Sequence, residues 1–146
     1  MKLLQGRQIL PHLILGGTYQ LNRCFMNGKS SCSSVLKLLE SCELAGITFL
    51  RGYIQFLFDG PILNAYTLPQ VTIANAILSP DSPGYRDALC AQIGKTVAVA
   101  DEELNQRIFF QFCDRTVISI SLREEDRVCV EAAMLQADAG KQWNVW

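Results

Sequence analysis

The stretch RIFFQFCDRTVISISL, from Arg107 to Leu122, decides how the rest of the chain is interpreted. Apolar residues occupy alternate positions on both sides of the central Asp114-Arg115 pair. Because successive side chains of a strand point to opposite faces, this period of two predicts two antiparallel strands joined by a tight turn. One face of the predicted hairpin is strongly apolar. The other face is mixed, because Phe109 and Val117 interrupt its polar positions.

A weaker copy of this pattern, YIQFLFDGPILNAYTL, runs from Tyr53 to Leu68. Its turn, Asp59-Gly60-Pro61, is typical of a short hairpin, since glycine accepts positive φ. A helix-like segment followed by a glycine precedes each hairpin, at residues 36–44 and at residues 85–93. A glycine after a helix is a common C-terminal cap. We therefore interpret the two hairpins as parts of a tandem repeat.

These observations predict an α+β fold, with a mostly antiparallel sheet of about seven or eight strands and two helices packed on one face. The domain spans residues 35–146 and consists of two similar units, residues 35–79 and 82–146, which share one core. Residues 101–106 are extra in the second unit and are expected to form a loop. Any α+β protein rich in hairpins contains segments of similar pattern, so a chance likeness between the two units is the alternative to duplication.

The N-terminal part of the chain differs from the rest, because its first acidic residue is Glu40. We interpret residues 1–34 as an extension of the domain. An added structural or interface element and a targeting segment are the alternatives for residues 1–25. The apolar run there is interrupted by Pro11 and His12 and is too short to cross a bilayer, so no membrane segment is expected.

Composition narrows the class of protein. The chain has 146 residues, of which 49% are hydrophobic and 18% are charged, and its net charge is −1. This length suffices for one globular core without disulfides. The charged fraction is below the roughly 25% usual for soluble domains, which indicates that part of the surface is covered by self-association or by a partner. No nucleic acid is expected, because its binders normally carry a basic stripe.

The cysteines and histidine do not form a recognisable metal or catalytic pattern. The six cysteines show no C-x-x-C spacing, and His12 is the only histidine, so no zinc site, other metal or cofactor is predicted. Cys42, Cys90 and Cys129 are expected to be buried free thiols in a reducing cytoplasm. Two acidic runs, residues 101–103 and 124–126, are expected to be solvated. No catalytic residue is assigned, and the protein is predicted to lack enzymatic activity.

The F-x-F-D-G and F-x-F-C-D hairpins, the Ile-Gly-x-Thr-Val segment and the closing W-x-V-W resemble small uncharacterised bacterial α+β proteins, some of which are described as immunity-type partners of toxins. The likeness covers residues 35–146 and rests on strand and turn chemistry. It implies a bacterial, cytosolic and non-catalytic protein, and it transfers no site residue.

We therefore predict a non-enzymatic protein-interaction domain that forms a homodimer or small homo-oligomer. The alternative is a small-molecule binder or enzyme with a pocket between the helices and the sheet. The residues expected at the interface are aromatic or apolar side chains on mixed faces or at the chain end, namely Phe109, Val117, Trp143 and Trp146.

Overall fold

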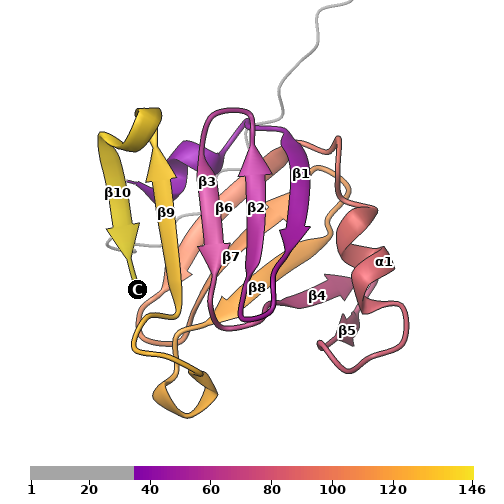
Figure 1. Cartoon of the computed structure of the whole chain (residues 1–146). Coiled ribbons are helices and arrows are strands. Elements are labelled where there is room, and N and C mark those ends of the chain that lie inside the picture. The colour runs from indigo at the N-terminus through magenta and orange to yellow at the C-terminus, as the bar shows by residue number, and fades with distance from the viewer. Residues whose placement is uncertain (1–34) are drawn as a thin grey trace, which may run out of the picture.

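The computed structural model describes residues 35–146, so the predicted extension of residues 1–34 lies outside the described residues. The described chain folds into two five-stranded antiparallel sheets that pack face to face (Figure 1). The first sheet contains, in spatial order, β1 (Leu44–Phe49), β2 (Ile54–Phe58), β3 (Ile62–Ala65), β9 (Ala133–Ala137) and β10 (Gln142–Val145). The second sheet contains β5 (Ala76–Leu78), β4 (Gln70–Ile73), β8 (Val117–Ser121), β7 (Arg107–Phe112) and β6 (Val97–Glu103).

Each half of the chain contributes one hairpin to the sheet that is built mainly from the other half. The first sheet joins β1, β2 and β3 to the β9-β10 hairpin from the second half, through pairing of β3 with β9. The second sheet joins β6, β7 and β8 to the β4-β5 hairpin from the first half, through pairing of β8 with β4. Each sheet therefore needs both halves. The matching order agrees with a tandem repeat, although duplication of one unit stays a prediction.

The predicted α+β fold is wrong, because the described residues form ten strands and no helix of seven or more residues. The expected helix over residues 36–44 is only the 3₁₀ turn η1 (Leu36–Leu39), and the expected helix over residues 85–93 is the six-residue α1 (Tyr85–Cys90). Ser41 has φ 70°, which ends the first helical turn. The following Glu43 then forms an antiparallel bridge with Thr96, and β1 begins at Leu44.

The predicted loop over residues 101–106 is wrong for its first three residues, whereas residues 104–106 form the turn before β7. Strand β6 continues through Glu103, and Asp101 pairs with Phe109 in the ladder between β6 and β7. Pairing with β7 satisfies the backbone groups of this segment. Its acidic composition did not indicate this pairing. The acidic run of residues 101–103 thus belongs to a strand. In contrast, residues 124–126 form the exposed 3₁₀ turn η2 (Glu124–Asp126).

The core lies between the two sheets and is built from their inward-facing side chains. Phe56 of the first sheet meets Phe110 of the second edge to face, with ring centroids 5.4 Å apart. Phe110 also contacts the rings of Phe58 and Phe112 in the same geometry. Edge-to-face aromatic pairs add stabilisation beyond the burial of their area. The strongest apolar positions of both predicted hairpins therefore meet in one core.

The sheets are joined at one corner, where the starts of β1 and β6 run side by side. The N–H of Val97 donates to the carbonyl of Cys42, and the N–H of Ser41 donates to the carbonyl of Val97, both at 2.9 Å. Gly94, with φ +84°, adopts a conformation that favours glycine, and its N–H donates to the carbonyl of Leu44 at 2.8 Å. These bonds satisfy backbone groups that would otherwise be unpaired at the corner.

The η1 turn packs against the second sheet, and the α1 helix contacts one strand of each sheet. The η1 turn lies against β6, where the N–H of Ala100 donates to Oε1 of Glu40 at 3.0 Å. The α1 helix lies against β1 and β4, with Arg86 stacked 5.6 Å from the ring centroid of Phe49. The hydroxyl of Tyr85 donates to the carbonyl of Pro69 at 2.7 Å, and burial raises the pKa of Tyr85.

The described cysteines are less buried than predicted. Cys42 is half-buried, and its Sγ donates to the carbonyl of Leu38 at 3.1 Å. Burial, and secondarily the charge of Asp59, raise the pKa of the Cys42 thiol. Cys90 and Cys129 are exposed, which corrects the expectation that they are buried. Cys129 lies in a connection between sheets, where its apolar neighbours Val128 and Val130 are exposed as well.

Candidate functional site

The outward face of the first sheet carries no charged side chain at the ladder positions of its five strands. Residues opposite one another in adjacent strands lie on the same face, so the pairing register identifies this surface. Each strand contributes two such positions. We call this surface the uncharged face; its residues are Gly46, Thr48, Gln55, Leu57, Ile62, Asn64, Met134, Gln136, Trp143 and Val145.

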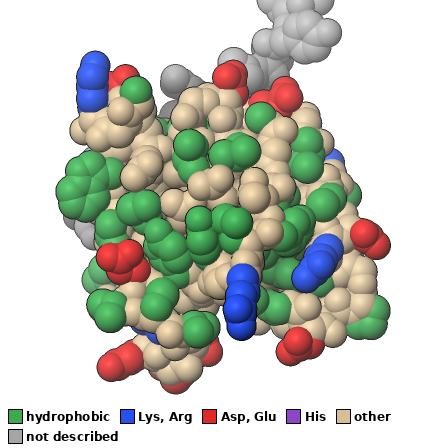
Figure 2. Space-filling model, in the orientation of Figure 1, with side chains coloured by type: hydrophobic (Ala, Val, Ile, Leu, Met, Phe, Trp, Pro, Cys, Tyr) green, Lys and Arg blue, Asp and Glu red, His purple; other side chains and the backbone are tan. Residues whose placement is uncertain are grey.

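Each of the three central strands, β2, β3 and β9, contributes one apolar and one amide side chain to the uncharged face. Nε2 of Gln55 donates to Oδ1 of Asn64 at 2.9 Å, which fixes the two central amides. Trp143, on the edge strand β10, is 63% exposed. In Figure 2, hydrophobic side chains are spread over this side of the molecule, while most acidic and basic ones lie toward its margins. Large apolar side chains beside satisfied amides are the composition of protein interfaces.

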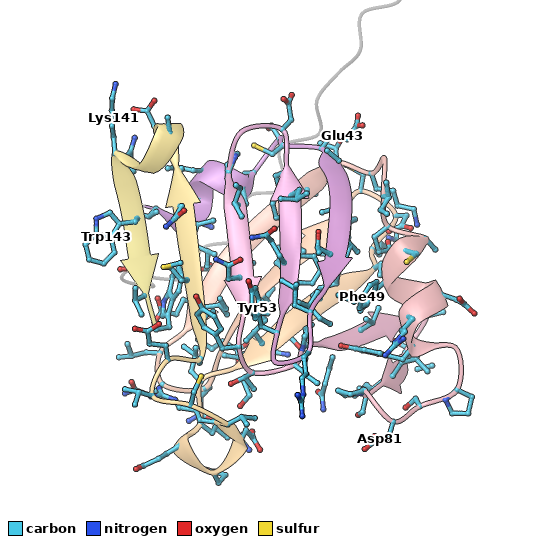
Figure 3. All side chains as sticks on the ribbon, viewed as in Figure 1. Glu43, Phe49, Tyr53, Asp81, Lys141 and Trp143 are labelled. Carbon is cyan, nitrogen blue, oxygen red and sulfur yellow. The ribbon has the colours of Figure 1, made fainter. Side chains whose placement is uncertain are left out.

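The uncharged face extends beyond the ladder into a pair of tyrosines. Tyr53 precedes β2 and Tyr66 follows β3, and their ring centroids are 5.5 Å apart at an angle of 55°. Figure 3 shows Tyr53 near one end of β2 and Trp143 projecting from β10 at the sheet edge. Burial, followed by the charge of Glu131, raises the pKa of Tyr66. The hydroxyl of Tyr66 is therefore neutral at neutral pH.

The outward face of the second sheet has a different chemistry. Charged residues occupy its ladder positions at Asp101, Glu103 and Arg107. NH2 of Arg107 donates to Oε1 of Glu103 at 2.6 Å, and the guanidinium carbon lies 5.3 Å from the ring centroid of Phe109. We call this surface the charged face; its residues are Gln70, Thr72, Ile77, Val99, Asp101, Glu103, Arg107, Phe109, Gln111, Val117, Ser119 and Ser121.

A groove of about 560 Å³ crosses one end of the charged face. Its floor is formed by strands β4, β8, β7 and β6, and its wall includes η2 and the segment that follows it. The groove lies on the outside of a sheet, whereas the alternative function considered from the sequence placed a pocket between the helices and the sheet. It is lined by Thr67, Leu68, Gln70, Pro80, Glu103, Gln106, Arg107, Ser119, Ser121, Arg123, Asp126 and Val128.

Hydrogen bonds hold the charged groups of the groove in place. The hydrogen bond from Arg107 lowers the pKa of Glu103, and the same bond raises the pKa of Arg107. Nε of Arg123 donates to Oε1 of Gln106 at 3.0 Å. The hydroxyl of Ser121 donates to Oδ2 of Asp126 at 2.6 Å. Both carboxylates of the groove therefore already accept a hydrogen bond from the protein.

The four residues predicted to form an interface do not lie on one surface. Phe109 and Val117 are neighbours on the charged face, on adjacent strands. Trp143 lies on the uncharged face of the other sheet. Trp146 is partly buried against the core, and its Nε1 donates to Oε2 of Glu102 on β6 at 3.0 Å. The last tryptophan therefore links the two sheets.

Sequence patterns did not identify Leu57, Ile62 or Met134, which are apolar residues of the uncharged face. A signal was present for the first two, since they occupy the second face of the Tyr53–Leu68 hairpin. Met134 carried no comparable signal. It reaches this face only because β9 pairs with β3, a contact between residues far apart in the chain.

Among residues 35–146, no group of three or more His, Cys, Asp or Glu side chains is placed to hold a metal ion. No helix of this range is long and apolar enough to span a membrane. His12 and the cysteines at positions 24 and 32 lie outside the described residues.

Comparisons with family models, curated proteins and solved structures give no match for this chain. The resemblance to immunity-type bacterial proteins therefore stays a prediction.

Proposed function

We propose that this protein is a non-enzymatic interaction protein that forms a homodimer through the uncharged face. One observation carries the proposal. Matching strands build both sheets, yet the outward ladder positions of the first sheet hold no charge, whereas those of the second hold Asp101, Glu103 and Arg107. A difference between two equivalent surfaces indicates that they meet different surroundings.

The absence of charge favours a second copy of the chain as the occupant. A twofold axis places the same patch on both subunits, so a charged side chain near the axis would meet its own copy. Like charges across an interface cost several kcal/mol, roughly. On the uncharged face, Leu57, Ile62 and Met134 would meet one another, while Gln55 and Asn64 already satisfy each other at 2.9 Å.

The proposal includes a cytoplasmic location, supported by the cysteine spacing and by the absence of a predicted disulfide framework. It is tested separately by counting thiols in intact full-length protein with and without a reductant. An equal count supports the reducing compartment. A count that rises by several thiols after reduction contradicts it.

Sedimentation velocity of the full chain at increasing protein concentration tests the dimer. We expect a concentration-dependent shift from monomer to dimer, and we expect Trp143→Glu to move the equilibrium toward monomer. Leu104→Glu is the matched control, because Leu104 is also a large apolar residue, 69% exposed, but lies in the turn between β6 and β7 of the second sheet. A monomer at every concentration would contradict the proposal and leave a foreign protein as the alternative partner.

A further inference from the structure

We propose that the groove on the charged face binds a small molecule through an oxyanion, either a carboxylate or a phosphate, with Arg107 and Arg123 as the anchoring residues. This site is independent of the proposed dimer, because it lies on the outward face of the other sheet. Its volume of about 560 Å³ falls within the range of roughly 300–1,000 Å³ that is typical of small-molecule sites.

The register brings the two arginines to one part of the groove. Arg107 lies directly opposite Ser121 in the ladder between β7 and β8. Arg123 follows Ser121 by two residues, and its backbone N–H donates to the Ser121 hydroxyl at 3.2 Å. Both side chains line the groove. Both arginines and Ser121 therefore line the same groove.

Each guanidinium is held from one side and keeps donors for a ligand. Within the described residues, Arg107 uses one N–H on Glu103, and Arg123 uses one on Gln106. A guanidinium has five N–H donors, and its planar arrangement suits the two oxygens of a carboxylate or phosphate. Stacking of Arg107 on the Phe109 ring further restricts its orientation. Positioning before binding reduces the entropy that an incoming anion must overcome.

The rest of the groove fits a polar molecule with a short carbon skeleton. Ser119 and Gln70 lie opposite each other on the floor and offer hydroxyl and amide groups. Thr67 also lines the groove. Leu68 and Val128 add apolar contacts at the rim.

Two-dimensional ¹H–¹⁵N NMR of the full chain tests the site by following the arginine Nε–H signals during separate titrations at constant ionic strength. The probes are inorganic phosphate and citrate, which distinguish a phosphate source from a carboxylate source. We expect saturable shifts at Arg107 and Arg123 with at least one probe. The signal of Arg51, an exposed arginine between β1 and β2, should stay unchanged.

Substitutions then distinguish specific binding in the groove from nonspecific attraction of anions to exposed arginines. Arg123→Gln and, independently, Arg107→Gln should each weaken binding at least tenfold, while Arg51→Gln should leave it unchanged. If loss of the Arg107–Glu103 pair disturbs the fold of Arg107→Gln, Arg123→Gln still tests the site, because it leaves that pair in place. Small non-saturating shifts at all arginines, or unchanged affinity in both groove variants, would overturn the proposal.

Discussion

Ile62 and Val117 hold equivalent places in the two sheets, but their surroundings differ. Ile62 lies between Leu57 and Gln136 in the first sheet, and Val117 lies between Gln111 and Thr72 in the second. Elsewhere on these two faces, the second sheet carries the Arg107–Glu103 pair, whereas the first carries the Gln55–Asn64 pair. Equivalent backbone positions thus support an uncharged surface on one side of the molecule and a charged groove on the other.

The inner faces show no such divergence. Phe56 and Phe110 are both fully buried and touch each other across the core. Inward positions at the centre of both sheets must fill one shared space at high packing density, which favours apolar side chains there. Outward positions are free of that limit, so function can differ between two faces built on the same strand pattern.

The largest expected loss of stability comes from substitutions in the core that the two inner faces share. Phe110→Ala should lower the free energy of unfolding by about 3–5 kcal/mol, because the ring is fully buried and meets three other phenylalanines. Phe56→Ala should give a loss of similar size, since the same contact is broken from the other sheet. Chemical denaturation measures both. A loss below about 1 kcal/mol for either variant would show that the sheets do not share one core.

A smaller effect is expected where the far edges of the two sheets meet. Glu102→Ala should cost about 1 kcal/mol, because it removes the acceptor of the Trp146 indole N–H. Glu125→Ala is the control, because Glu125 is also acidic but is exposed in η2. Thermal unfolding monitored by tryptophan fluorescence compares the two variants. Equal stability of both would mean that the 3.0 Å contact does not link the sheets in solution.

The smallest expected effect is a pH-dependent change in the free energy of unfolding, which should come from the second sheet alone. The hydrogen bond from Arg107 lowers the pKa of Glu103 below its usual value of 4.5. A lowered folded-state pKa stabilises the fold above pH 4.5, and this stabilisation is lost as pH falls through the lower folded value. The pair is exposed, so its contribution should be below about 1 kcal/mol.

Denaturation of the parent chain and of Glu103→Gln between pH 6 and pH 3, roughly, measures this contribution. The variant should lose less stability on acidification. Asp114→Asn serves as a comparison: burial acts to raise the pKa of Asp114, but hydrogen bonds from Lys95 and Thr116 outweigh it and leave that pKa lowered. A steeper acid loss in Glu103→Gln than in the parent would contradict the assigned direction.

Local patterns in the sequence predicted the two central hairpins well. Strands β2 and β3 fall within the Tyr53–Leu68 pattern, and β7 and β8 fall within the Arg107–Leu122 pattern. Both pairings are between neighbours in the chain, so alternation and turn residues were enough to reveal them. The antiparallel character of the sheets was predicted correctly for the same reason.

Long-range contacts explain what local patterns could not predict. The pairing of β3 with β9 and of β8 with β4 divides the strands between two sheets, and nothing local in either partner indicates it. The β4-β5 hairpin was missed because its turn places Ala74 and Asn75 at positive φ without a glycine. Of the candidate interface, Trp143 was identified from the sequence, whereas the contribution of Met134 depends on the strand order.

The central claim is that the uncharged face, and not the charged face, mediates self-association. Sedimentation equilibrium of full-length Ile62→Glu and Val117→Glu tests it most directly, because both variants place the same charge at equivalent, partly exposed positions of the two sheets. We predict that Ile62→Glu raises the dimer Kd at least about tenfold, a loss of about 1.4 kcal/mol or more, while Val117→Glu keeps the parent value. Equal Kd values for the two variants, or a greater loss in Val117→Glu, would contradict the account.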